Sequence, residues 1–150
     1  MFPLFPKFRG SGALLALIVP LLITSAGCNR YSRTKQCRAL IAQINPAIDE
    51  VTALTHGGAG SSSGSFVAAA GRYERLAKQL GPMEFASEDM AKLVAEYAGL
   101  LTTSALDLRN LATAIDSNNT IESDRINREL ERISAHERTV VGRMDAWCQP

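Results

Sequence analysis

The chain has 150 residues, the length of one domain, and 46% of them are hydrophobic against 21% charged. That balance is typical of a globular protein able to bury a core. The formal net charge is +1, so there is neither a basic excess that would favour nucleic acid nor an acidic tail, and we expect no nucleic-acid partner. Aromatic residues make up only 6%.

The first segment has the three-part layout of an export signal. Lys7 and Arg9 supply positive charge, residues 13–23 are an apolar run, and small residues 24–27 precede Cys28. The apolar run is shorter than the roughly 20 residues needed to span a bilayer. The layout therefore predicts a secretory signal rather than a membrane-spanning helix.

The residues before Cys28 carry a resemblance to a known class. Ala26 and Gly27 directly before the cysteine resemble the lipobox of bacterial lipoproteins, although Ser25 stands where that motif usually has an aliphatic residue. The resemblance implies that residues 1–27 are removed and that Cys28 is acylated and becomes the mature N-terminus. The protein would then be lipid-anchored in the cell envelope, on the periplasmic face of either membrane or at the cell surface. The alternative is an ordinary signal cleaved near Ala26, with Cys28 a spare thiol.

The cysteine count agrees with lipidation. The chain has three cysteines, and lipid on Cys28 would leave Cys37 and Cys148 as an even pair. Because export places this pair in an oxidising compartment, we expect a disulfide between them.

The sequence from Cys28 onward predicts a tether followed by four helices. We expect a tether over residues 28–34 and a bundle domain over residues 35–150. Apolar residues at steps of three and four predict helices over residues 35–54, 65–80, 87–116 and 120–147. Residues 56–64 form a glycine–serine linker, which lacks the order of a phosphate-binding loop. Pro46 predicts either a kink or a restart of the first helix with Asn45 as its N-cap.

No segment shows the two-residue alternation of a strand. The sequence therefore predicts an all-α protein, an antiparallel up-down-up-down four-helix bundle that follows the signal peptide. In that topology the start of the first helix and the end of the fourth lie at the same end, which would bring Cys37 and Cys148 together. The 81–86 turn would share that end, while the linker and the 117–119 turn would lie at the opposite end.

The sequence offers no convincing catalytic, metal or cofactor motif. His56 and His136 belong to no CxxCH or HExxH motif, and no CxxC occurs. Residues 60–64 and 32–35 match the bare spacings GxSxG and SxxK, but the first match lies in a glycine–serine linker with no preceding strand, and neither has the accompanying motifs that define those enzyme classes. We therefore expect no catalytic, metal-binding or cofactor-binding residue. The competing interpretation is a haem bound in the bundle by His136 with Met90 or Met144.

Glu137 is an acidic residue in the apolar seam of the fourth helix. We favour a position at the rim of the core, since charged side chains are seldom buried without a partner. The alternative is a buried role, pairing with Arg72 or Arg75 or specifying helix register.

These observations favour a non-catalytic envelope lipoprotein whose bundle binds or scaffolds another envelope protein. The alternative is a carrier of haem or another small ligand in the bundle interior. Both rest on fold-level analogy.

Overall fold

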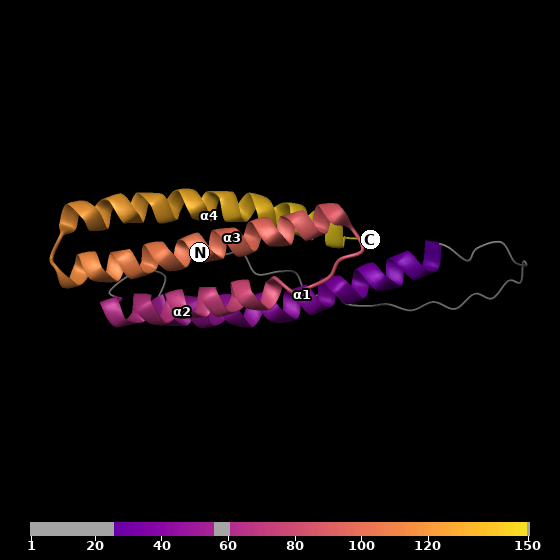
Figure 1. Cartoon of the computed structure of the whole chain (residues 1–150), viewed down its shortest axis with the longest axis horizontal. Coiled ribbons are helices and arrows are strands. Elements are labelled where there is room, and N and C mark those ends of the chain that lie inside the picture. Colours follow the sequence, from indigo (N-terminus) through magenta and orange to yellow (C-terminus); the bar gives the residue numbers. More distant parts are fainter. Residues whose placement is uncertain (1–25, 56–60, 150) are drawn as a thin grey trace, which may run out of the picture.

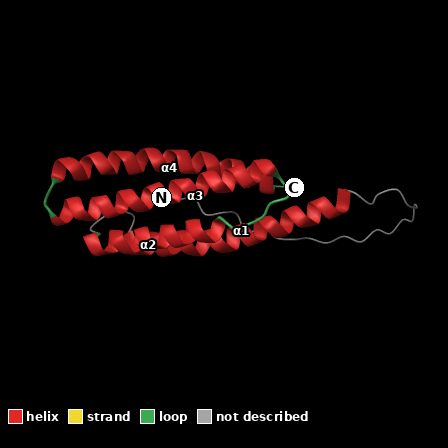
Figure 2. Cartoon of the chain, viewed as in Figure 1, coloured by secondary structure: helices red, strands yellow, loops and turns green. Residues whose placement is uncertain are grey.

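A computed structural model describes residues 26–55 and 61–149, with side chains from residue 32 onward. These residues form four helices, α1 (Ala26–Thr55), α2 (Ser63–Leu80), α3 (Glu88–Asp116) and α4 (Thr120–Cys148). No strand occurs in either described range, and the helices lie side by side along one long axis (Figure 1, Figure 2). The prediction of an all-helical bundle is confirmed.

The helices do not contact one another equally. The α2–α3 contact is the most extensive, α3–α4 and α1–α2 follow, and close approaches between α1 and α4 are few. Small buried side chains in α2 and α3 allow these two backbones to lie close together. They are Ala69, Ala70, Ser104, Ala105 and Ala112. Helices α1 and α4 therefore have fewer close backbone approaches than the other three neighbouring pairs of helices.

Side-chain caps define where three of the helices begin. The Ser87 hydroxyl caps α3 by accepting a hydrogen bond from the N–H of Met90 at 3.3 Å. Asn119 caps α4 by accepting from the N–H of Glu122 at 3.1 Å. Ser62 caps α2 by accepting from the N–H of Ser65. The α2 helix therefore begins at Ser63, two positions before the predicted start.

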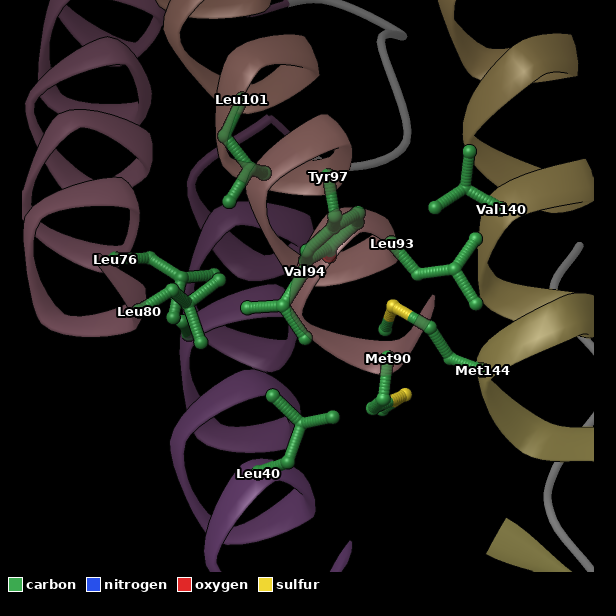
Figure 3. Packing of buried hydrophobic residues seen from close by; sticks show 11 residues of the cluster. Leu40, Leu76, Leu80, Met90, Leu93, Val94, Tyr97, Leu101, Val140 and Met144 are labelled. Carbon is green, nitrogen blue, oxygen red and sulfur yellow. The ribbon is translucent and has the colours of Figure 1, made fainter. Parts of the chain in front are cut away.

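Two apolar clusters fill the interior, one after the other along the bundle axis. The first lies toward the ends of α2 and α4 and the start of α3; Figure 3 shows Leu40, Leu76, Leu80, Met90 and other members converging from all four helices. The second includes members from the opposite part of each helix. These are Val51, Phe66, Ala69, Ala70, Ala105, Leu108, Leu111, Ala112, Ala114 and Ile126. Tyr73 of α2 packs against both clusters and so marks the boundary between them.

Helix α1 differs from its predicted form in three respects. It begins at Ala26 rather than at residue 35, so residues 28–34, expected to be a tether, are helical. It also continues through Pro46 without restarting at Asn45. Pro46 has no N–H for the carbonyl of Ala42, but both residues are exposed, so water can satisfy that carbonyl.

The third difference concerns the buried stripe of α1. Ile41 has the spacing of an apolar stripe residue, yet it is 47% exposed, whereas Leu40 and Ala47 are buried. The reason is that α1 packs mainly against α2 and has few close approaches to α4. The face of α1 that becomes buried is therefore narrower than its apolar pattern suggests.

Candidate functional site

Two cysteines of the helical domain meet at one end of the bundle. The sulfur atoms of Cys37 in α1 and Cys148 in α4 lie 2.09 Å apart, and their Cα atoms are separated by 5.8 Å. This Cα separation falls within the usual range for a disulfide. Cys37 is only 5% exposed, so solvent has little access to its side of the bridge.

Further contacts surround the cysteine pair. The Arg33 guanidinium lies over the ring of Trp147, 5.1 Å from the ring centroid, and donates a hydrogen bond to the carbonyl of Gln149. A guanidinium over an indole face is an attractive cation–π arrangement. These contacts join the first turns of α1 to the last turn of α4. The contacts of Arg33 also stabilise helical structure at the end of residues 28–34, where a tether was expected.

Gln36 joins the same part of α1 to the loop between α2 and α3. Its amide nitrogen donates to the carbonyl of Glu84, and its amide oxygen accepts from the N–H of Ala86, both at 3.4 Å. The start of α1, the α2–α3 loop and the end of α4 therefore lie together. We refer to this part of the molecule as the disulfide end.

The predicted lipidation residue adjoins the disulfide end. The backbone of Cys28 belongs to α1, but its side chain and residues 1–25 lie outside the described part of the chain. The signal-peptide and acylation predictions therefore fall on residues whose structure is not described. Within residues 26–55 and 61–149, no helix has both the length and the hydropathy to cross a membrane.

A polar group lies inside the bundle beside the boundary of the two apolar clusters. The Tyr97 hydroxyl of α3 donates to Oε1 of Glu137 in α4 at 3.3 Å. Tyr97 is buried and Glu137 is half-buried. Burial raises the pKa of Glu137 above its ordinary value, while the Tyr97 hydrogen bond and the charge of Arg138 act in the opposite direction.

The pKa values of two tyrosines near Glu137, Tyr73 and Tyr97, are also shifted. Burial, with a smaller contribution from the Glu137 charge, raises the pKa values of Tyr73 and Tyr97. Both phenols are therefore neutral at physiological pH, and Tyr97 is the one that donates a hydrogen bond to Glu137.

Neither arginine considered as a partner of Glu137 forms an ion pair with it within the described residues. The Nε of Arg72 lies 2.6 Å from Glu50 instead. The hydrogen-bond partner of half-buried Glu137 is Tyr97, which the sequence did not nominate. A signal was present, since a tyrosine in a buried stripe needs a partner for its hydroxyl. An acidic residue in the facing seam supplies that partner.

His136 lies at the surface between α3 and α4. Its Nε2 is 2.8 Å from Oε1 of Glu96, its side chain is 54% exposed, and Arg143 lies 3.9 Å from the second oxygen of Glu96. Met90 and Met144, in contrast, are buried in the first apolar cluster. The three residues considered as haem ligands therefore do not point into a common space.

The described residues offer no group of three or more His, Cys, Asp or Glu side chains arranged to hold a metal ion. His56, the other histidine, lies outside the described ranges. The features that remain for a functional interpretation are the disulfide end and the interior polar group. Comparison of the chain with protein-family models, with curated proteins and with solved structures found no match.

Proposed function

We propose that this protein is a lipid-anchored envelope protein with a non-catalytic helical bundle that binds or scaffolds another envelope protein. Residues 1–27 would be its export signal and Cys28 its acylated N-terminus. The observation that carries the proposal is the use of cysteines. Cys37 and Cys148 lie at disulfide distance, and the third cysteine of the chain directly follows the signal-like segment. A disulfide is expected in an exported protein, where it persists.

The proposed topology of the bundle is antiparallel, up-down-up-down. Two observations support it. The 81–87 loop and the 117–119 turn lie at opposite ends of the helices they join (Figure 2). In addition, α1 near Cys37 lies against the end of α4, as an even number of alternating helices requires. An acylated Cys28 would then hold the disulfide end toward the membrane, with the 117–119 turn directed away from it.

The Tyr97–Glu137 pair inside the bundle is consistent with a binding role for the outer helix faces. The polar group of Tyr97 and Glu137 is surrounded by apolar side chains from several helices. Buried polar pairs of this kind can specify which helix faces meet, as single polar residues do in coiled coils. We assign the pair this structural role, which leaves the outer helix faces for contact with a partner.

Intact-mass analysis of protein extracted from the membranes of a bacterial host tests the anchor. The expected species begins at Cys28, carries added acyl mass, and takes up two alkyl groups only after reduction. The Cys28→Ser variant is the matched control and should lack the acyl mass. A species cleaved elsewhere, or one with three freely alkylated thiols, would contradict the proposal.

Cross-linking in purified envelopes tests the binding role. The wild-type chain should form a discrete adduct with another envelope protein, whose identity mass spectrometry would establish. Cys28→Ser should form less of this adduct, because the variant is no longer held at the same membrane surface. Failure to recover any adduct would count against a scaffolding or binding function.

A further inference from the structure

Charge is distributed unevenly along α1. The first acidic residue of the chain is Asp49, and every charged residue before it is basic. Four of these basic residues follow Cys28 within a short stretch of α1. They are Arg30, Arg33, Lys35 and Arg38. We call residues 28–38 the basic stem.

The stem begins beyond the last residues of α4. Arg33 contacts Trp147 and Gln149, the final described residues at that end, so the helical turn before Arg33 extends past the bundle. Figure 1 shows the indigo start of α1 projecting beyond the end of α4. At 1.5 Å per residue, residues 28–32 add about 8 Å of helix.

The charges of the stem are not neutralised by the bundle. Lys35 and Arg38 are exposed, and neither forms an ion pair with any residue in the described ranges. Ion pairs elsewhere are common, as Arg72–Glu50 and Arg109–Glu74 illustrate. Lys35 and Arg38 therefore keep their positive charges available to a partner outside the chain.

We propose that the basic stem binds the anionic phospholipid headgroups of the membrane in which Cys28 is anchored. This inference rests on the proposed lipid anchor, which would hold the stem at the membrane surface. Basic segments beside a membrane anchor are attracted to anionic lipid. One lipid anchor and one polybasic patch are also a recognised pair of signals for stable membrane attachment.

The geometry predicts that the contributions of Arg30, Lys35 and Arg38 to membrane binding decrease with distance from Cys28. With α1 upright, the Cα atoms of Arg30, Lys35 and Arg38 lie about 3, 10 and 15 Å above Cys28. Side chains on a helix lean toward its N-terminus, which brings each charge closer to the membrane. Because the screening length is about 8 Å at physiological salt, Arg30 should contribute most and Arg38 least.

Acidic residues at the disulfide end do not cancel this attraction. The Glu84 backbone lies level with Gln36, and Asp145 accepts from the Gln149 side chain at 3.0 Å. Both are therefore one turn or more farther along α1 from Cys28 than Arg30. Glu88 is already paired with Lys92 at 2.7 Å.

The test uses Trp147, the single tryptophan of the chain, as a native probe beside the stem. Protein expressed as the full chain and extracted from membranes is reconstituted in vesicles that contain a headgroup-labelled energy acceptor. The vesicles are phosphatidylcholine, with or without phosphatidylglycerol. Transfer from Trp147 to the acceptor should be greater in the anionic vesicles and should fall to the neutral level at high salt.

Matched variants assign the effect to the stem. Arg30→Gln should lower the ratio of surface-bound to detached stem about fivefold, and Lys35→Gln, which removes a charge farther from Cys28, should lower it less. Arg38→Gln should have the smallest effect. Arg128→Gln is the charge-matched control, because this exposed residue lies about 30 Å from Cys148 along α4 and should leave transfer unchanged.

Two results would overturn the inference. One is equal transfer in neutral and anionic vesicles, and the other is a loss in Arg128→Gln as large as that in Lys35→Gln. Intact mass separates this failure from failure of the anchor. Acylated protein without a lipid preference refutes the stem alone. Unacylated protein with a salt-sensitive preference that Lys35→Gln weakens refutes the anchor alone.

Discussion

Removal of the cysteine bridge is the most direct test of what holds this bundle together. The perturbation is the double variant Cys37→Ser with Cys148→Ser, which leaves no unpaired thiol in the domain. The bridge links residues separated by 111 positions in sequence. In the chain-entropy model, closing a loop of that length stabilises the native state by about 5 kcal/mol. Since domains of this size are stable by roughly 5–15 kcal/mol, the loss should be large.

The arrangement of the helices predicts which helix loses most stability when the disulfide is removed. Close approaches between α1 and α4 are few, so the bridge and the adjoining Arg33–Trp147 contact are principal ties between these helices. Without the bridge, α1 is held mainly by α2 and by the apolar side chains that it buries. Backbone amides of α1 should therefore exchange faster with solvent, relative to wild type, than those of α3.

Urea unfolding followed by far-ultraviolet circular dichroism measures the global effect. With a denaturant slope of about 2 kcal/mol/M, the midpoint should fall by about 2.5 M. Reductant supplies the control, because it should shift wild type toward the variant and leave the variant unchanged. A midpoint change below about 0.5 M, corresponding to about 1 kcal/mol, would refute the reasoning.

Three further predictions concern the interior and one helix cap. Burial raises the pKa of Glu137 above its ordinary value of 4.5, so its stabilising contribution is complete below about pH 4.5 and is lost as pH rises through the raised value. Glu137→Gln, which keeps an acceptor for the Tyr97 hydroxyl, should therefore stabilise the fold in urea unfolding at pH 7 and have little effect at pH 4; equal effects at both pH values would contradict this. Leu76→Ala should destabilise by about 2–5 kcal/mol because Leu76 is fully buried, whereas Ile121→Ala, at an 82% exposed position, should change unfolding by less than about 0.5 kcal/mol. Ser87→Ala should cost about 1 kcal/mol by removing the α3 cap, and Ser87→Asn should restore most of it; a full loss in both variants would show that the hydroxyl does not act as a cap.

Much of the local structure could be predicted from the sequence. The apolar repeats of α2, α3 and α4 each predict a helix within one or two residues of its observed start, and Ile126, Ile133, Val140 and Met144 are all buried in the α4 seam. These predictions succeed because helix periodicity and capping depend on residues only a few positions apart. The location of Cys28 beside a signal-like segment is likewise a local pattern, and its acylation stays a prediction.

Contacts between distant parts of the chain could not be predicted as well from the sequence. The sequence offered Arg72 or Arg75 as a partner for Glu137, but the structure pairs it with Tyr97. It also gave no indication that Arg33 would lie over Trp147. Both contacts depend on which faces of two helices meet, and no short-range pattern encodes that choice.

The sequence by itself predicted that this protein is helical, where α2, α3 and α4 begin to within one or two residues, and that one cysteine follows the signal-like segment while two lie in the helical domain. Only the tertiary structure decided that α1 continues through the expected tether, that Ile41 remains exposed, and that a tyrosine–carboxyl pair lies inside the bundle. The physical reason is the range of the interactions. A helix forms from hydrogen bonds between residues four apart, whereas burial and polar pairing are set by the packing of segments far apart in the chain.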